Sequence, residues 1–270
     1  MKIYLKTILT NEAELIYILS QIMELKNIVD KFLIVEPGFT HTGDYRDFIG
    51  IDRILQKVGN LSSKIDYIPI PMNKKIKTAK NSEHSAHENE KITRGCFVDY
   101  LKFNGGDLII STDADEVIYK EVILKIIKSK KFKINPFYAC SLQLNQLMYN
   151  DGLIAKEHKF IGPSVIKFRR SFFNKGYYNW RYAGFEYEEI GGFHFSWCFP
   201  IDDLVKKVQA FAHGPSYFVS ENDARSKIEN DIEKMQYSFR SEKIILSKFS
   251  ETKLEYPNGY IEAKKIWSYK

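Results

Sequence analysis

The stretch Asp107–Val117, which reads DLIISTDADEV, carries the most information about the fold and the function of this chain. Its first part, Leu108–Thr112, is an apolar run typical of a buried strand. Three carboxylates follow within four residues, at Asp113, Asp115 and Glu116. Ligands of open α/β sheets bind outside the carboxyl ends of the strands, so we expect a binding site at this point of the chain.

The sequence on either side of this stretch alternates between strand and helix signals. Apolar runs that end at Pro or Gly predict strands, and apolar residues at helical spacing predict the helices between them. The expected strands are 2–9, 30–36, 64–70 and 107–112, and the expected helices are 11–26, 47–58, 88–103 and 117–129, with a polar loop at 71–86. This alternation predicts an α/β fold with a mainly parallel sheet flanked by helices.

The second half of the chain has a different character. We expect strands at 137–149 and 164–168, a segment rich in glycine and aromatic residues at 171–195, and helices at 201–212 and 221–237. The chain is expected to form one domain over residues 1–270. Within it, residues 1–130 would be the nucleotide-binding half and residues 131–270 the acceptor-side half.

Composition excludes several classes of protein. The formal charge of the 270 residues is +6, but the lysines are scattered, whereas a nucleic-acid-binding protein concentrates them on one element. The three cysteines, Cys96, Cys140 and Cys198, form no CxxC pair, which argues against a zinc site or a disulfide framework. No apolar run is long enough for a membrane span or a signal peptide. We therefore expect a cytoplasmic protein without a membrane span and without a nucleic-acid partner.

Asp113 and Asp115 have the spacing of residues that share one side of an extended chain, so both can grip one cation. Carboxylate oxygens suit Mg²⁺ or Mn²⁺, and such an ion neutralises the diphosphate that leaves a nucleotide-sugar donor. The alternative is a helix start, in which Ser111, Thr112 or Asp113 caps the helix. In that case the following carboxylates would only complement the helix dipole.

A second segment, residues 191–199, reads GGFHFSWCF. Paired glycines allow the backbone to approach a ligand closely. His194 lies among aromatic residues in this segment, where a histidine is either a core residue or a ligand.

Together these segments resemble glycosyltransferase family 17, the β-1,4-mannosyl-glycoprotein 4-β-N-acetylglucosaminyltransferases. Thr10–Glu12 with Leu15 resembles the opening "NE…L" of the family, and Val29–Glu36 with Thr42-Gly43 resembles "VDxFVIVE…TG". The "D-x-DE" and "GWHxSW" motifs, the "E…R" pair and the trailing "K…H" are matched by Asp113–Glu116, Gly192–Trp197, Glu90 with Arg94, and Lys206 with His213.

The chain also departs from the family pattern. Phe193 stands where tryptophan is usual, Val117-Ile118 replaces "IP", and no glutamate follows closely after His213. These departures leave the metal motif intact and put the acceptor in doubt.

The resemblance implies a GT-A-type fold, a UDP-N-acetylglucosamine donor, a divalent cation (Mn²⁺ or Mg²⁺) and inverting transfer to a glycan acceptor. In this interpretation Asp115 binds the metal directly, and Asp113 contacts the metal or the donor ribose. His213 or His194 supplies a further metal ligand.

Two further residues are candidates for donor binding. Glu36 ends the second expected strand, at the same sheet edge, and could contact the donor's base or ribose. It could equally be a surface carboxylate beside a turn. Arg94 could hold a phosphate through its bidentate guanidinium, or could pair with Glu90 four residues earlier on the helix.

Inversion requires a general base, and the candidates are Glu186, Glu188 and Glu189, unless these are only solvent-facing charges. The aromatic residues expected to form a sugar platform are Tyr182, Phe185, Phe193 and Trp197. Two other functions stay open: a glycoside hydrolase that uses two carboxylates, and a glycan-binding protein without catalysis.

Overall fold

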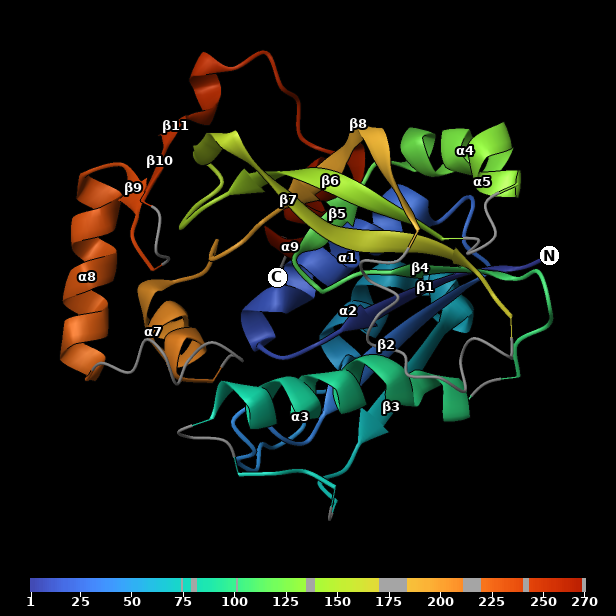
Figure 1. Cartoon of the computed structure of the whole chain (residues 1–270), viewed down its shortest axis with the longest axis horizontal. Coiled ribbons are helices and arrows are strands. Elements are labelled where there is room, and N and C mark those ends of the chain that lie inside the picture. Colours follow the sequence, from blue (N-terminus) through green and yellow to red (C-terminus); the bar gives the residue numbers. More distant parts are fainter. Residues whose placement is uncertain are drawn as a thin grey trace.

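The computed structural model describes residues 1–73, 75–78, 82–100, 102–134, 139–169, 184–210, 220–239 and 243–268. The first half alternates strands with helices (Figure 1). Its elements are β1 (Ile3–Ile8), η1 (Glu12–Glu14), α1 (Leu15–Leu25), β2 (Lys31–Pro37), α2 (Asp52–Val58), η2 (Gly59–Lys64), β3 (Ile65–Ile70), α3 (Glu83–Gly95), η3 (Cys96–Asp99) and β4 (Leu108–Ser111).

The second half is built mainly from longer strands. Its elements are β5 (Glu116–Ile118), α4 (Lys120–Lys128), α5 (Lys130–Ile134), β6 (Ala139–Leu147), β7 (Leu153–Lys167), β8 (Phe185–His194), α7 (Ile201–Ala210), α8 (Glu221–Glu233), β9 (Gln236–Tyr237), β10 (Ile244–Ile245), β11 (Ser247–Lys248), η6 (Phe249–Glu251) and α9 (Asn258–Ser268).

One sheet runs through both halves in the order β3-β2-β1-β4-β7-β6-β8-β5. The first four strands are parallel, and β6 and β8 are also parallel, while β7 and β5 pair antiparallel with their neighbours. The sequence prediction of an α/β fold with a mainly parallel sheet flanked by helices is confirmed. The strand order reverses between β1 and β4, and such a switch point is where open α/β sheets bind ligands.

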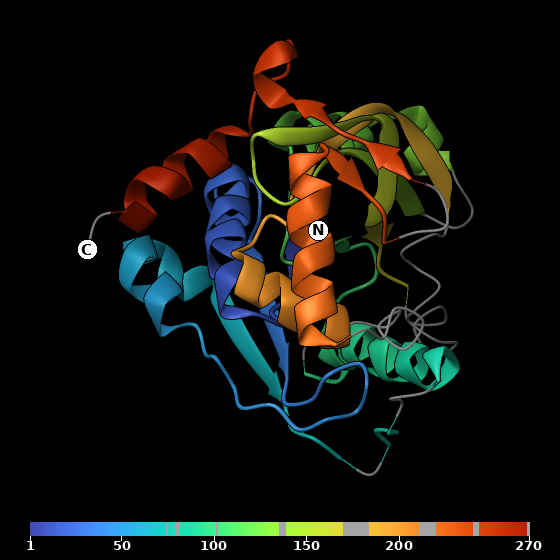
Figure 2. The same ribbon diagram turned by 90° about the vertical axis from the view of Figure 1, so that its left-hand side faces the viewer.

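Alternate residues of the parallel strands pack on opposite faces of the sheet. Leu5, Ile34 and Ile110 join the core under α1, α2 and α4, whereas Tyr4 and Ile109 join a smaller core with Phe97 of η3. Figure 2 shows α1, α2 and α9 on one side and α3 on the other. Helix α9 packs along α1, and Gly259 allows this contact because a Cβ atom there would lie 2.4 Å from the Ser20 carbonyl oxygen.

Several element boundaries differ from the sequence prediction. The expected helix 117–129 begins only at Lys120, because Val117 and Ile118 are completely buried and pair with β8 as strand β5. Helix α3 begins at Glu83, capped by Ser82, inside the predicted 71–86 loop. Residues 236–237, expected to be helical, form strand β9 after the positive φ of Met235.

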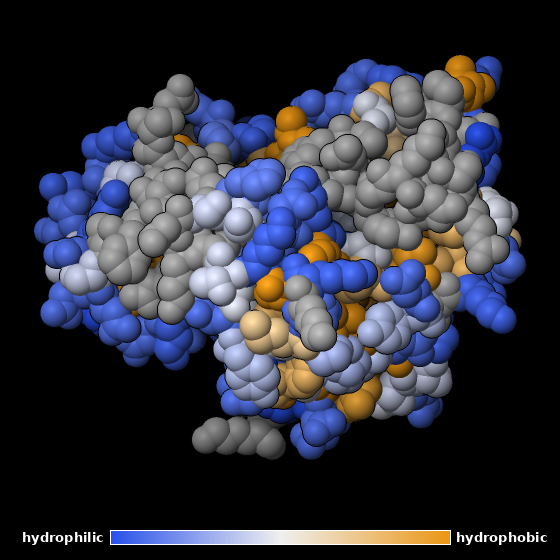
Figure 3. Space-filling model, turned by 60° about the horizontal axis from the view of Figure 1, so that its bottom comes forward, coloured by the Kyte–Doolittle hydropathy of each residue, from blue (hydrophilic) through white to orange (hydrophobic). Residues whose placement is uncertain are grey.

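On the face of the molecule in Figure 3, hydrophilic residues predominate and apolar ones gather in a limited central area. Exposed large apolar side chains in the described part of the chain include Tyr45, Phe48 and Met72, from the loops after β2 and β3. None of the helices in that part of the chain is long and apolar enough to span a bilayer.

Candidate active site

The acidic loop, residues 112–116, joins β4 to β5 at the switch point of the sheet. It is not a helix start, because Glu116 already belongs to β5 and lies opposite His194 of β8. The buried Gln21 of α1 holds the loop from below. Its Nε2 atom lies 2.7 Å from the carbonyl oxygen of Asp113 and 2.9 Å from that of Glu116. The carboxylate of Glu116 also accepts from the backbone N–H of Asp113 at 2.8 Å.

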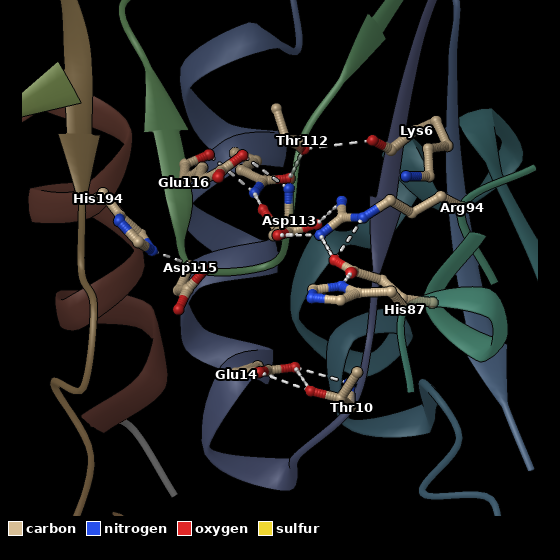
Figure 4. A network of polar contacts seen from close by, with 12 residues as sticks. Lys6, Thr10, Glu14, His87, Arg94, Thr112, Asp113, Asp115, Glu116 and His194 are labelled. Atoms are coloured by element: carbon tan, nitrogen blue, oxygen red, sulfur yellow. Dashed lines mark hydrogen bonds and ion pairs between the residues drawn. The ribbon is translucent and has the colours of Figure 1, made fainter. Parts of the chain in front are cut away.

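Asp113 is held by Arg94 of α3 (Figure 4). The two guanidinium Nη atoms donate to the two carboxylate oxygens at 2.6 and 2.9 Å, a bidentate pair. Arg94 also donates to Glu90, four residues earlier, at 2.9 and 3.0 Å, and Nδ1 of His87 lies 3.0 Å from the same carboxyl group. The ion pair with Glu90 within helix α3 is therefore present, and the guanidinium of Arg94 binds two carboxylates.

These contacts change the pKa values of the network. Burial would lower the pKa of Arg94, but Asp113 and Glu90 outweigh it and raise the pKa. Burial would likewise raise the pKa of Glu90, and the charge of Arg94 overcomes this and lowers it to about 2. Both groups are charged at neutral pH, so Arg94, Asp113 and Glu90 form a network of ion pairs.

Asp115 has different partners. Its Oδ2 atom lies 3.1 Å from Nζ of Lys207 on α7, and its Oδ1 atom lies 3.5 Å from Nε2 of His194. Burial alone would raise the pKa of Asp115, but Lys207 and His194 outweigh it and hold the pKa well below its usual range. Figure 4 shows Asp115 turned toward His194 and Asp113 turned toward Arg94, so the two carboxylates do not face one cation together in this structure.

The paired glycines 191 and 192 bring His194 to this place. A Cβ atom on Gly192 would lie 2.1 Å from the carbonyl oxygen of Val117, and its φ is +152°. The close approach predicted for these glycines is therefore made to strand β5. It lets β8 pair with β5, and Phe195 N then donates to the Asp115 carbonyl oxygen at 2.7 Å.

Glu14 is a buried carboxyl group next to this cluster. Its carboxylate accepts from the backbone N–H groups of Thr10 at 2.6 Å and Asn11 at 3.1 Å, which forms a capping box at η1. Burial raises the pKa of Glu14 to about 7; Lys207 lowers it and Asp115 raises it. The charge of Lys207 thus acts on two carboxyl groups, Asp115 from the loop after β4 and Glu14 from η1.

Asp115 and His194 are the residues that fit a divalent cation. A carboxylate and an imidazole suit Mn²⁺ or Mg²⁺, but no group of three or more His, Cys, Asp or Glu in the described part of the chain is arranged around a metal. Nδ1 of His194 is buried and has no hydrogen-bond partner among the described residues, although metal-bound histidines usually have one. These two side chains would supply only part of the coordination shell of a divalent cation, and other ligands would have to complete it.

Glu36 serves the loop after β2. Its fully buried carboxylate accepts from Ile49 N at 2.6 Å, Gly50 N at 3.0 Å and the hydroxyl of Tyr67 at 2.7 Å. Arg46 lies 3.4 Å from it and also donates to backbone carbonyls. Glu36 is therefore not the surface carboxylate considered from the sequence. Its contact with the donor's base or ribose stays a prediction.

The structure does not bring the three candidate bases to Asp115. Glu186, Glu188 and Glu189 are exposed on β8, and Glu188 and Glu189 pair with lysines of α4 and α5. An extended chain rises about 3.3 Å per residue, so even Glu189 lies roughly 16 Å along the strand from His194.

The predicted sugar platform is likewise not assembled at the site. Phe193 (0% exposed) and Trp197 (5%) lie inside an aromatic core with Phe195 and Tyr237, and offer no face to a sugar. Phe185 lies at the far end of β8, beneath Lys131. Tyr182 and His213 are outside the described residues.

Three site residues were missed in the sequence: Lys207, Glu14 and Gln21. In the resemblance to the family, the lysine of the trailing "K…H" was matched by Lys206. Lys206 is exposed and its Nζ atom lies 3.8 Å from Asp203, whereas Lys207 contacts Asp115. A signal existed for Glu14, because Asn11 followed by Glu14 is a capping pattern. A buried glutamine in an apolar helical stripe also indicates a tertiary polar contact.

The family model described as Glycosyltransferase family 17 matches residues 1–247. No curated protein matches the chain. Among solved structures, 4-diphosphocytidyl-2C-methyl-D-erythritol synthase is similar, with 10% sequence identity, a TM-score of 0.37 and 98% of each chain covered.

Proposed function

We propose that this chain, which belongs to glycosyltransferase family 17, transfers N-acetylglucosamine from a UDP-sugar to a glycan hydroxyl with inversion. The family model covers residues 1–247 and makes the chain a glycosyltransferase. The sugar, the nucleotide, the metal and the acceptor are the proposed parts.

The observation that carries the proposal is the position of Asp115. It lies at the end of the loop after β4, at the switch point of the sheet, with Lys207 3.1 Å and His194 3.5 Å from its carboxylate. A buried carboxylate that faces a lysine ammonium and an imidazole is costly to maintain for structure alone. Perturbed titratable groups at a strand-end site are typical of functional centres.

Asp115, with His194 beside it, would hold the divalent cation. Such a cation, Mn²⁺ or Mg²⁺, would supply the positive charge that stabilises the departing nucleoside diphosphate. Asp113 is fixed by Arg94. We assign it to a ribose hydroxyl of the donor, because an ionised carboxylate has about four acceptor sites and can bind a hydroxyl beside a guanidinium. In this arrangement Arg94 positions Asp113 and has no phosphate to hold.

The general base has a geometric requirement that the three β8 glutamates do not meet in this structure. A base must reach the acceptor hydroxyl at hydrogen-bond distance, directly or through one water. Glu186, Glu188 and Glu189 lie far along β8 from Asp115, so they are not part of the proposed mechanism.

The experiment is a panel of nucleotide-sugars hydrolysed with and without Mn²⁺, using wild type and Asp115→Asn. We expect UDP-N-acetylglucosamine to give metal-dependent release of UDP, and Asp115→Asn to reduce the rate by about 100-fold or more because the charge on the metal ligand is lost. Asp99→Asn is the control, since Asp99 is exposed on η3. Near-normal metal-dependent turnover of Asp115→Asn would contradict the proposal.

A further inference from the structure

Lys207 places a positive charge next to Asp115, the proposed metal ligand. Its ammonium lies 3.1 Å from Oδ2 of Asp115 and 4.5 Å from the centre of the Phe199 ring. The side chain is 23% exposed and Asp115 only 7%. Burial would lower the pKa of Lys207, but Asp115 and Glu14 outweigh it and raise the pKa, so the ammonium is charged at neutral pH.

The neighbouring lysine shows that this placement is specific. Consecutive helix residues point about 100° apart, so only one of Lys206 and Lys207 can face the sheet. Lys207 faces the acidic loop, while the Lys206 side chain is 75% exposed and lies 3.8 Å from Asp203. The two residues have the same chemistry and differ only in whether the ammonium contacts Asp115.

The ion pair between Lys207 and Asp115 can also break and re-form more easily than the pair between Arg94 and Asp113. Arg94 grips Asp113 through two parallel hydrogen bonds, which fix both partners. Lys207 makes one contact to Asp115 through a flexible four-carbon stem with a point charge. Because Lys207 is partly exposed, its ammonium can leave Asp115 without unpacking the helix.

We propose that Lys207 has two alternative anionic partners: Asp115 in the resting site, and the diphosphate of the donor once a divalent cation has taken its place on Asp115. This inference rests on the proposed function. Lys207 then competes with the metal for Asp115 when no nucleotide is bound. When the nucleotide is bound, Lys207 supplies a second positive charge to the diphosphate, which a lysine ammonium binds well.

The two roles predict opposite changes in Lys207→Met, which keeps an unbranched side chain one atom shorter and removes its charge. Without nucleotide, Mn²⁺ should bind about threefold to tenfold more tightly, because its competitor for Asp115 is gone. With Mn²⁺ present, UDP should bind about tenfold or more weakly, because a charged hydrogen bond to phosphate is lost. Electron paramagnetic resonance of free Mn²⁺ measures the first quantity, and calorimetry with UDP measures the second.

Lys206→Met is the matched control and should change neither affinity. If Lys207→Met does not fold, Lys207→Arg gives the same test with the opposite sign. A bidentate arginine should hold Asp115 more firmly and weaken Mn²⁺ binding. Weaker or unchanged Mn²⁺ binding by Lys207→Met, or unchanged binding by Lys207→Arg, would overturn the inference while metal-dependent UDP binding by wild type still supports the proposed function. Wild type that binds neither Mn²⁺ nor UDP would overturn both.

Discussion

The two aspartates of the acidic loop, Asp113 and Asp115, present the same functional group to two different environments. Asp113 faces α3, where Arg94 binds it with two hydrogen bonds and links it to Glu90 and His87. Asp115 faces α7 and β8, where one lysine contact and one histidine surround it. The first arrangement is a fixed support and the second is an exchangeable one. Two carboxylates in one motif can therefore have separate roles.

The largest effect is expected when the support of Asp113, the guanidinium of Arg94, is removed. Arg94→Met leaves Asp113 and Glu90 without their shared cation, and breaking a buried ion pair typically costs about 3–5 kcal/mol. We expect a loss of this size in the free energy of unfolding, measured by urea denaturation. The control is Arg53→Met, whose partner Glu12 is more than half exposed, so the loss should be about 1 kcal/mol or less. Equal losses in both variants would show that the Arg94 network is not a support.

The next prediction concerns how His194 comes to lie on the exchangeable side. Gly192→Ala would force a Cβ atom to within 2.1 Å of the Val117 carbonyl oxygen, at a φ that L-residues rarely adopt. We expect a loss of about 2–4 kcal/mol and a displaced His194, seen as thermal destabilisation with a shifted imidazole resonance. Gly105→Ala is the control, because nothing lies within 4 Å of its added Cβ atom. A Gly192→Ala protein as stable as this control would contradict the strand contact.

A smaller effect is expected from the pH dependence of Glu14. Its pKa is raised to about 7 in the folded protein from 4.5, so the folded state binds this proton more tightly than the unfolded state. The resulting stability is present below pH 4.5 and is lost as the pH rises through about 7. In Glu14→Gln this part of the decline should be absent from unfolding midpoints measured between pH 5 and pH 8. A wild-type slope that persists in Glu14→Gln would assign it to another group.

The smallest effect belongs to a carboxylate outside both environments. The Glu188 side chain is 90% exposed and lies 3.7 Å from Lys131. We expect Glu188→Gln to keep kcat/KM for UDP-sugar turnover within a factor of about two and to leave the unfolding midpoint unchanged. A large loss of kcat at constant stability would restore Glu188 as a candidate base.

The local pattern of the sequence was sufficient for the parallel half of the molecule. A buried strand and an amphipathic helix have different hydrophobic periodicities. The local sequence therefore predicts strands at β1, β2, β3 and β4 and a helix at α1. It was insufficient at Val117-Ile118, which were expected in a helix. Strand β5 has only three residues, Glu116–Ile118, which are too few to show a hydrophobic period. Pairing with β8 decided their conformation.

For the candidate site, too, the sequence predicted some features and the tertiary structure decided others. The sequence by itself determined that carboxylates follow the fourth strand and that a histidine lies among aromatics, since residue identity and strand order are local facts. The tertiary structure alone decided that Arg94 holds Asp113, that Lys207 rather than Lys206 reaches Asp115, and that the β8 glutamates lie away from both. The physical reason is that an ion pair depends on which helix face turns inward and which strands pair. Packing across distant parts of the chain sets both.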